Sequence, residues 1–458
     1  MATNSAQEQL MLELINRARM NPAAEAARYG ISLNQGLAPG TISASPKQVL
    51  AMNDLLVVAA DQHSNWMLVH DVFNHNETAG AGFSGALFTT RMTAAGYVFA
   101  GPVIASGENI SWIGALPGPI NLTTSILAQH KSLFLSPGHR VNILNATFEE
   151  VGIGQQHGAF LSGGKNYDAS MVTQDFAVSG SKTFVTGVVY NDTVVNDNFF
   201  TVGEQTAGRA VTSPGATTDT TGGGGGYELS FAAFGPTTVS FSLATGVITV
   251  GVTVGANNIK LDVVNGHEVW TNTHTSVIGG PITEVHALGI QPISLTGGAA
   301  NDKLFGNPSA NKLTGNAGND LVDGGSGNDN MTGGPGNDTF VGGLGIDTLA
   351  GGPNNDYFVF NAALNSGNRD IITDFNHVND AFRLENAVMK TIGGPGALSP
   401  AFFRAGAAAL DANDHIIYNK ASGYVDYDSN GNAAGGVTHL FLLTNKPGDI
   451  ASNDFVVI

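Results

Sequence analysis

Three stretches in the first 150 residues repeat hydrophobic positions with the period of an α-helix. In residues 5–29 the apolar positions that fall on one stripe are Leu10, Met11, Leu14, Ile15 and Ala18. Such a stripe predicts an amphipathic helix that buries one face, and residues 45–70 and 122–134 predict two more. Residues 136–144 (SPGHRVNIL) predict a short fourth helix, because Ser136 is a good N-cap and Pro137 a good first helical residue.

Later segments follow the shorter period of β-strands. Residues 150–154 and 169–178 each predict a strand. Because helices precede these strands, residues 1–180 are expected to form an α/β sandwich. Residues 181–290 contain short β-branched runs separated by clusters of Gly, Asn, Asp and Pro, which is the spacing of an antiparallel β-sandwich.

Between residues 297 and 359 the period becomes nine. Seven nonapeptides follow one another, from GGAANDKLF to GGPNNDYFV. Asn311 stands once at the position that the other repeats fill with Asp302, Asp320, Asp329, Asp338, Asp347 and Asp356. Two positions later, every repeat has an apolar residue: Leu304, Leu313, Val322, Met331, Phe340, Leu349 and Phe358. This is the G-G-x-G-x-D-x-U-x pattern of the calcium-binding parallel β-roll.

The residue types of the repeat suit calcium. Glycine lets the chain turn sharply, so that backbone carbonyls approach an ion, and aspartate adds hard oxygens to a shell of six to eight. One repeat cannot complete that shell alone, whereas stacked neighbours can. We therefore predict several calcium ions, bound by the six aspartates and by the turn residues Gly324, Gly325, Gly327, Gly333, Gly334, Gly336, Gly342, Gly343, Gly345, Asn319, Asn328 and Asn337. A flexible linker would have no reason to keep this register.

Composition and charge exclude several classes of function. The net charge of -18 among 458 residues argues against binding to nucleic acid or to an anionic membrane surface. The absence of cysteine excludes disulfides and Cys-ligated zinc, and no apolar run predicts a membrane span. The first residues lack the pattern of a secretory signal peptide. That would favour the cytosol, but weak oxygen-ligand calcium sites require more calcium than the cytosol offers.

The N-terminal motifs point to a known family. They are, in order, LELINRAR (12–19), AADQHSNWM (59–67), FNHN (73–76), AAGY (94–97), GENI (107–110), SPGHRVNIL (136–144), EVGIG (150–154) and VTQDFA (172–177). This series resembles the bacterial branch of the CAP superfamily, which includes cysteine-rich secretory proteins, insect antigens and plant pathogenesis-related proteins. The resemblance covers roughly residues 6–178. It implies a cleft with two histidines and two glutamates that holds a divalent metal in some members.

Only half of that cleft set transfers to this chain. His75 and Glu108 match the first pair, whereas Ser136 stands where the second glutamate is expected and Met171 where the second histidine is expected. His139, in the first turn of the predicted short helix, is expected to be neutral there and can supply the missing imidazole. His75, Glu108 and His139 then have the ligand types of an open transition-metal site, and they are the candidate catalytic residues.

Each of these residues also has a structural interpretation. His75 can end a helix with its ring bonded to the backbone, and Glu108 can hold the following loop through N–H groups. For Arg140 a structural ion pair is favoured over a substrate contact. His63 lies on a helix face and is expected to be structural.

Residues 183–262 resemble a transthyretin-like or Cna-B-like module. The residues that carry this resemblance are GVVYNDTVVNDNFFTVGE (187–204) and GGYEL (225–229). One further calcium ion is a candidate there, with the ligands Asp192, Asn196, Asp197 and Glu204. An ordinary polar hairpin is the favoured alternative.

The C-terminal residues resemble the last domain of serralysin-type RTX proteins. The resemblance rests on DIITDFNHVNDAFRLE (370–385), YVDYDSNGNAAGGVTHLFLL (424–443) and DFVVI (454–458). It implies a type I exporter that reads an uncleaved C-terminal address, which would account for the missing signal peptide. Neither H-E-x-x-H nor G-x-S-x-G occurs, so the zinc-protease and lipase activities of many such proteins are not indicated.

These observations predict a secreted, extracellular calcium-binding protein with four domains. They are a CAP domain (1–180), a β-sandwich module (181–290), a β-roll (291–365) and a C-terminal secretion domain (366–458). The favoured function is non-enzymatic binding of an apolar ligand or a protein partner in the CAP cleft. The alternatives are a metal-assisted hydrolase or peptidase that uses His75, Glu108 and His139, and a surface adhesin.

Overall fold

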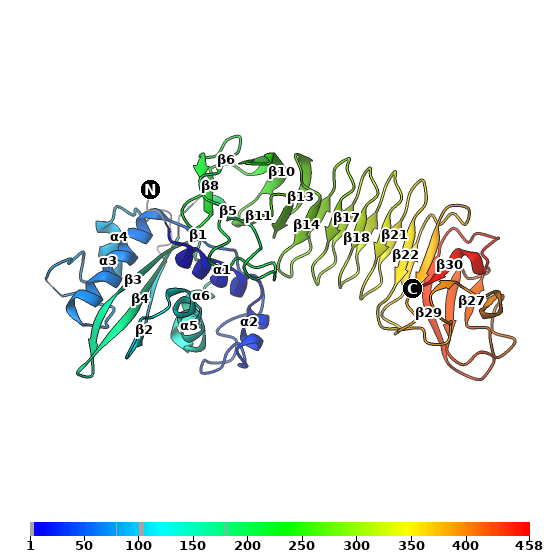
Figure 1. The fold of residues 1–458 in the computed structure, drawn as a ribbon, viewed down its shortest axis with the longest axis horizontal. Helices are drawn as coiled ribbons and strands as arrows, with labels where there is room; N and C mark the ends of the chain where they lie inside the picture. The colour runs from blue at the N-terminus through cyan, green and yellow to red at the C-terminus, as the bar shows by residue number, and fades with distance from the viewer. Residues whose placement is uncertain (1–3, 79, 100–104, 179, 181) are drawn as a thin grey trace. The chain divides into compact units, whose positions relative to one another are not determined.

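The computed structural model describes residues 4–78, 80–99, 105–178, 180 and 182–458. The chain divides into two compact units (Figure 1). The first consists of the described residues up to 248 together with 252–266, and the second of 249–251 and 267–458.

The helices of the first unit precede and flank one sheet. They are α1 (Ala6–Met20), α2 (Pro22–Arg28), α3 (Asp54–His70), α4 (Phe88–Ala94), α5 (Leu122–Leu135) and α6 (Pro137–Ile143). The single helix predicted over 5–29 is broken into α1 and α2. The reason is Pro22, which has no N–H for the α-helical ladder, while the Asn21 side chain accepts the N–H of Ala24 and caps α2.

The helix predicted over 45–70 begins only at Asp54. Residues 51–53 are extended instead, because the N–H of Ala51 bonds the carbonyl of Glu149 and the N–H of Asn53 bonds that of Val151. Asn53 then caps α3 through its side chain. Helical periodicity alone could not reveal this pairing with a strand about a hundred residues away.

A four-stranded sheet lies at the centre of this region. Its strand order is β1 (Ala51–Met52), β3 (Glu150–Ser162), β4 (Lys165–Ala177) and β2 (Ser106–Ala115). Figure 1 shows α3 and α4 on one side of the sheet and α1, α5 and α6 on the other. Gly152 and Gly154 permit the close approach of α3, because a Cβ on either would collide with its backbone.

The β-rich residues that follow in the first unit are not purely antiparallel as predicted. Their strands are β5 (Thr183–Tyr190), β6 (Ala210–Thr212), β7 (Asp219–Thr220), β8 (Gly226–Phe231), β9 (Gly235–Leu243), β10 (Gly246–Val254) and β11 (Ile259–Val264). β5 pairs antiparallel with β8 but parallel with β11. The sheet around β5 is therefore mixed.

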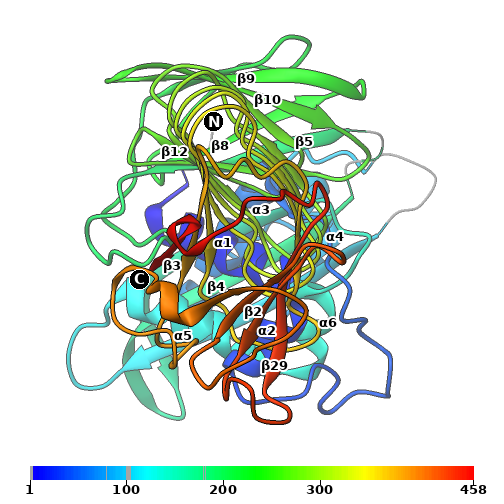
Figure 2. The ribbon, with the colours of Figure 1, turned by 90° about the vertical axis from the view of Figure 1, so that its right-hand side faces the viewer.

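The second unit contains a parallel β-roll. Its strands are β12 (Glu268–Thr271), β13 (Thr275–Gly279), β14 (Glu284–Ala287), β15 (Ser294–Thr296), β16 (Lys303–Phe305), β17 (Lys312–Thr314), β18 (Leu321–Asp323), β19 (Asn330–Thr332), β20 (Thr339–Val341), β21 (Thr348–Ala350), β22 (Tyr357–Phe360), β23 (Asp370–Ile372) and β24 (Ala381–Leu384). From β12 to β22, each strand pairs in parallel with the strand two places on. Figure 2 views the roll along its length, with its turns one behind another.

The nine-residue period accounts for this arrangement. Nine residues carry the chain from one sheet to the other, and eighteen return it to the first, as in the pairing of Leu304 with Val322. The apolar residue at the centre of each three-residue strand then points inward, and all seven of these side chains are at most 1% exposed. One repeat cannot bury such a residue, so the repeats depend on each other.

Parallel pairing extends beyond the nonapeptides in both directions. It begins at β12, upstream of the predicted boundary at 291, and continues past 365 into the C-terminal segment. That segment contains β25 (Gly396–Ala397), β26 (Phe403–Ala405), β27 (Ile416–Asn419), β28 (Tyr424–Asp428), β29 (Val437–Leu443) and β30 (Phe455–Val457), with 3₁₀ turns at Pro400–Phe402 and Ser452–Asp454. β29 pairs with β23 and β30 with β24. None of the helices in the described residues is long and apolar enough to cross a bilayer.

Candidate functional site

The repeat aspartates form two columns along the roll. One column contains Asp302, Asp320, Asp338 and Asp356, and the other contains Asn311, Asp329 and Asp347. Within each column, one side-chain oxygen accepts the backbone N–H of the column residue eighteen positions earlier, at 2.7 to 2.9 Å. The columns are therefore fixed in position by the backbone of neighbouring turns.

The second oxygen of each carboxylate has no such partner. Oδ2 is buried and accepts no hydrogen bond from any described residue in Asp320, Asp329, Asp338, Asp347 and Asp356. In Asp302 the unpartnered oxygen is Oδ1, because Oδ2 accepts the N–H of Gly298. A buried carboxylate oxygen without a donor is costly, and it fits a calcium ion, which binds through oxygen.

Glycine makes room for these carboxylates. A Cβ at Gly324 would collide with Oδ2 of Asp329, and one at Gly333 with Oδ2 of Asp338. Gly336 has φ of +154°, and a Cβ there would overlap the carbonyl oxygen of Gly318 in the neighbouring turn. The glycines thus let backbone carbonyls and carboxylates approach closely enough to share an ion.

Burial without an ion changes the acidity of the columns. It raises the pKa of Asp338 and Asp347 to about 6 and that of Asp329 and Asp356 to about 7, although backbone N–H groups oppose the change. Calcium would reverse this effect, because a bound cation favours the ionised carboxylate.

The predicted asparagine ligands have a different position. Asn319, Asn328 and Asn337 each direct Oδ1 at a backbone N–H one turn further along, at 2.8 to 3.0 Å. These three side chains form a ladder that joins successive turns. Their predicted part in calcium binding stays a prediction.

Three aspartates that the repeat pattern missed extend the columns. Asp370 accepts the N–H of Asp347, Asp380 accepts that of Asp356, and Asp374 accepts those of Gly351 and Gly352. Their spacing of 22 to 24 residues breaks the period of nine. A signal was present nevertheless, because Asp370 and Asp380 each stand two residues before a fully buried apolar residue, Ile372 or Phe382.

The predicted trio of the CAP region is partly assembled. His75 lies in the loop after α3, Glu108 on β2 and His139 on α6. His75 Nδ1 lies 2.8 Å from Glu108 Oε1, and the ring centroids of His75 and His139 are 6.4 Å apart. Arg91 of α4, which sequence reasoning missed, donates to Glu108 Oε2 and to the carbonyl of His75. The Glu108 carboxylate therefore contacts the side chains of Arg91 and His75, and not the backbone N–H groups of the following loop.

A second layer of buried polar groups lies behind this trio. His63 of α3 is fully buried, and its Nδ1 lies 3.1 Å from Oε1 of Glu77, so its predicted structural role acquires a specific partner. Asp175 of β4 stands opposite Glu108 of β2. Burial, followed by the charge of Glu108, raises the pKa of Asp175 well above its usual range.

The ligand atoms of the trio are not gathered within 4.8 Å of one another, and Arg140 does not form the ion pair expected of it. Among the described residues, one set of three histidine, aspartate or glutamate ligand atoms lies within 4.8 Å of one another, and it is not this trio. A transition metal at His75 stays a prediction. Burial, followed by the neighbouring His75, lowers the pKa of His139, so its imidazole is neutral at pH 7. Arg140 donates to the carbonyls of Phe134, Leu135 and Gln35 instead of pairing with an acid.

The candidate calcium ligands between β5 and β6 lie in a closed loop. Glu204 accepts the N–H groups of Val194, Val195 and Thr201, and Asp192 accepts that of Asn198. Both carboxylates are buried, whereas Asn196 and Asp197 are exposed. The loop backbone thus uses the oxygens of Glu204, and the extra calcium ion stays a prediction.

The first unit also has a cavity of about 480 Å³ whose lining does not include His75. Its lining includes Gln9 of α1, Asp54 of α3, and Asp219 and Glu228 of the β-rich segment. Burial raises the pKa of Glu228 well above its usual range, and Glu150 and Asp219 add to the effect. No sequence pattern indicates this cavity, because its walls come from segments that are distant along the chain.

Comparison with known families identifies both regions. Residues 12–176 match the model of the cysteine-rich secretory protein family, the CAP family. Residues 296–331 and 332–362 match the RTX calcium-binding nonapeptide repeat. The chain therefore contains a CAP domain followed by RTX calcium-binding repeats, which confirms the two resemblances seen in the motifs.

No curated protein matches the chain. Among solved structures, an extracellular protein from Bacillus anthracis that contains an SCP domain is 21% identical, with a TM-score of 0.21, over 29% of this chain and 35% of its own. A subunit of the mannuronan C5-epimerase from Azotobacter vinelandii is 23% identical, with a TM-score of 0.16, over 35% of this chain and 80% of its own. This chain thus spans about a third of the first structure's length.

Proposed function

We propose that this is a secreted protein whose RTX roll folds when calcium enters the two aspartate columns, and whose CAP domain acts as a non-enzymatic binding module. The observation that carries the proposal is the row of buried carboxylate oxygens that accept no hydrogen bond from any described residue. If these oxygens had neither an ion nor a hydrogen-bond donor, their desolvation would destabilise the folded roll at every turn. Calcium removes that cost, and its binding energy becomes folding energy.

Secretion follows from the calcium concentration that such sites need. Oxygen-ligand sites of extracellular proteins work at about 10⁻⁴ to 10⁻³ M calcium, far above cytosolic levels. The roll would stay unfolded during synthesis and fold after export. A type I exporter is the proposed route, and the resemblance of residues 454–458 to such C-termini supports it.

The position of the C-terminus adds a condition on that route. Phe455–Val457 forms β30, which pairs with β24 at the end of the roll, and Phe455 is fully buried against Phe382. An exporter could read these residues only before the roll folds. Calcium-dependent folding would therefore keep the address accessible inside the cell and hide it outside.

For the CAP domain, we propose that an apolar ligand or protein partner binds around His75. The loop that carries His75 also exposes large apolar side chains: Phe73 is 43% exposed, Phe83 46% and Leu87 52%. In the same region, Arg91 and His75 already engage Glu108. This supports a stable binding surface more than a general base free to accept a proton.

The calcium part of the proposal is tested by titration of the full chain. Isothermal titration calorimetry should detect several calcium ions, and circular dichroism should report a gain of β-structure over the same concentration range. The variants Asp329→Asn and Asp338→Asn should each lower the stoichiometry or the affinity. Binding without any change in β-structure would overturn the proposed coupling of folding to calcium.

The CAP part is tested with the apolar fluorescent probe anilinonaphthalene sulfonate on the calcium-loaded chain. Phe73→Ser and Phe83→Ser should reduce probe binding. Phe234→Ser should not, because Phe234 lies outside the CAP domain although it is more exposed, at 63%. Peptide hydrolysis that is lost in His75→Ala and Glu108→Gln would overturn the non-enzymatic assignment and favour the hydrolase.

A further inference from the structure

The first strands of the roll carry polar side chains that the calcium columns do not use. β12 and β14 pair in parallel, with Glu268 opposite Glu284 and Trp270 opposite His286. Val269 and Val285 are buried inside the roll. Because side chains alternate along a strand, the residues on either side of these valines project from the outer face.

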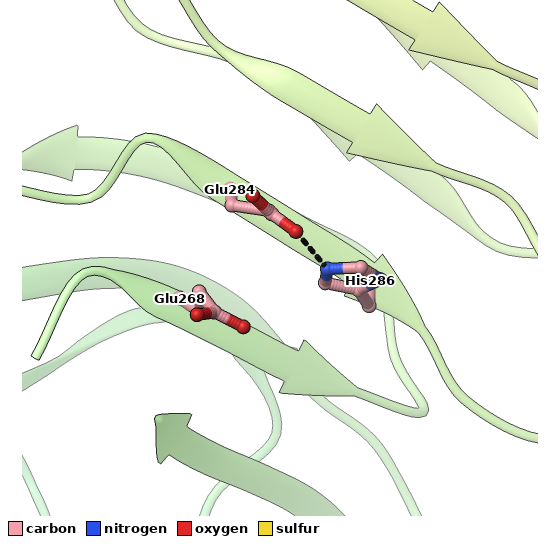
Figure 3. A group of neighbouring side chains, drawn as sticks. All are labelled: Glu268, Glu284 and His286. Carbon is pink, nitrogen blue, oxygen red and sulfur yellow. Dashed lines mark hydrogen bonds and ion pairs between the residues drawn. The ribbon is translucent and has the colours of Figure 1, made fainter. Parts of the chain in front are cut away.

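Three of these outward side chains converge. Glu268, Glu284 and His286 each offer a ligand atom, and the three atoms lie within 4.8 Å of one another. Figure 3 shows them on the same side of two adjacent strands, with His286 Nε2 at 2.8 Å from Glu284 Oε1. The side chains are 11%, 18% and 14% exposed, in that order, so water reaches the group from one side only.

Neighbouring residues hold this group in place. The imidazole of His286 is stacked between Trp270, at 3.8 Å and 5°, and Phe305, at 4.5 Å and 9°. Lys303 bonds Glu284 Oε2 at 3.2 Å, which leaves Oε1 directed at His286. The Trp270 indole N–H points at Glu268 Oε2, at 3.5 Å. Such outer contacts orient ligands before an ion arrives.

We propose that Glu268, Glu284 and His286 bind a divalent first-row transition metal ion of the Zn²⁺ type, with water completing its coordination. One imidazole nitrogen and two carboxylates are ligand types that zinc and its neighbours accept. Calcium fits poorly, because it needs six to eight oxygens, and Lys303, Trp270 and His267 already contact three of the four that the glutamates offer. The site is thus chemically distinct from the all-oxygen columns.

An ion at this position would join two strands of the roll. Glu268 comes from β12, and Glu284 and His286 come from β14, which pairs in turn with β16, the first strand of the nonapeptides. Repeat structures need a stabilised end, because the terminal unit has a neighbour on one side only. The metal would fix the register of β12 and β14 and so support the end of the roll.

The experiment measures Zn²⁺ binding to the calcium-saturated full chain by equilibrium dialysis and metal analysis. His286→Gln and Glu268→Gln should each weaken binding at one site by at least about tenfold. His377→Gln is the matched control, since its imidazole also pairs with a carboxylate of the same unit, Asp449, and it should leave binding unchanged. His75→Ala should also have no effect, which separates this site from the CAP trio.

Cobalt provides a second readout. Co²⁺ bound through nitrogen and oxygen gives visible absorption bands, which should be present in the wild type and absent from His286→Gln. Glu268→Gln nearly preserves the side-chain volume, so a loss of metal binding in this variant is not expected to come from misfolding. Calcium-dependent circular dichroism checks that both variants fold. Equal zinc stoichiometry and affinity in the wild type and both variants would overturn the site, as would a wild type that binds no zinc.

Discussion

Both the CAP domain and the roll bury carboxylates, but they compensate them differently. In the CAP domain, Glu108 faces Arg91 and His75, and Glu77 accepts the backbone N–H of Ser84 and lies beside His63. In the roll, the carboxylates stack in columns, and one oxygen of each accepts no hydrogen bond from the described chain. Glu108 and Glu77 thus have partners within the chain, whereas the second oxygens of the column carboxylates have none among the described residues.

The difference determines when each region can fold. A buried acid with an internal partner stabilises a domain in any medium, because the compensation belongs to the chain. A buried acid without one costs several kcal/mol unless it is protonated or bound to a cation. We therefore expect the same residue type to give a constitutively folded domain in one region and a calcium-dependent one in the other.

Removal of calcium is the most severe test of this comparison. In a calcium-depleted buffer at pH 7.5, the nonapeptides should lose their β-structure while the CAP sheet persists. Hydrogen exchange followed by mass spectrometry on the full chain measures both at once: protection should be lost in peptides from 297–359 and retained in those from 150–177.

Magnesium is the appropriate control for that experiment. It is smaller than calcium and prefers near-ideal octahedral geometry with several retained waters, so it should restore little protection at the same concentration. Loss of protection in both regions together would contradict the comparison, because it would make the CAP domain depend on the roll.

The sequence revealed these two regions to very different extents. The roll is periodic, so the position of Asp320 predicts that of Asp338 eighteen residues later. The inward-pointing apolar residues can be predicted from the same period. The network around Glu108 has no local signature, because Arg91 lies seventeen residues away and Asp175 reaches it across a sheet. Asp370 and Asp380 were missed because a loop breaks the nine-residue period before them.

The second prediction removes the internal compensation of the CAP domain. In Glu108→Gln the guanidinium of Arg91, which is fully buried, loses its closest negative charge. Breaking a buried pair from one side typically costs about 3–5 kcal/mol. The free energy of unfolding of the CAP domain should fall by roughly the lower value, since Arg91 keeps the carboxylate of Glu77 at 3.8 Å. Thermal unfolding followed by the fluorescence of Trp66 and Trp112 reports this domain.

His75→Ala is the matched variant for this measurement. It removes the other partner of Glu108, but the His75 side chain is 47% exposed, so it should cost less than about 1 kcal/mol. Both losses should be the same with and without calcium. A loss that appears only in chelator would show that the CAP domain draws its stability from the roll.

The third prediction concerns pH. Burial raises the pKa of Asp338 and Asp347 to about 6 and that of Asp329 and Asp356 to about 7 in the ion-free roll, against about 3.9 for an unfolded chain. Between these values the folded roll binds more protons, so its stability falls as pH rises through this window. Acidification from pH 7.5 to 4.5 should therefore restore part of the β-structure lost without calcium.

Circular dichroism of the calcium-depleted chain across this range measures the effect. In saturating calcium the dependence should be opposite, because protons compete with the ion, and acidification should weaken binding. A loss of β-structure on acidification without calcium would contradict this prediction. It would mean that some factor other than the ionised column carboxylates prevents folding at neutral pH.

The smallest predicted effect comes from the one column position without an aspartate. Asn311 lies in the column of Asp329 and exchanges two hydrogen bonds with Asn307, donating to its Oδ1 and accepting its N–H. In Asn311→Asp the donated bond is lost, at about 1 kcal/mol without calcium, while a further carboxylate becomes available to the ion. The calcium midpoint of folding should therefore fall, whereas Asn316→Asp, which adds the same charge at an exposed position outside the columns, should not lower it. Equal midpoints for the two variants would mean that net charge, and not position in the column, governs the response to calcium.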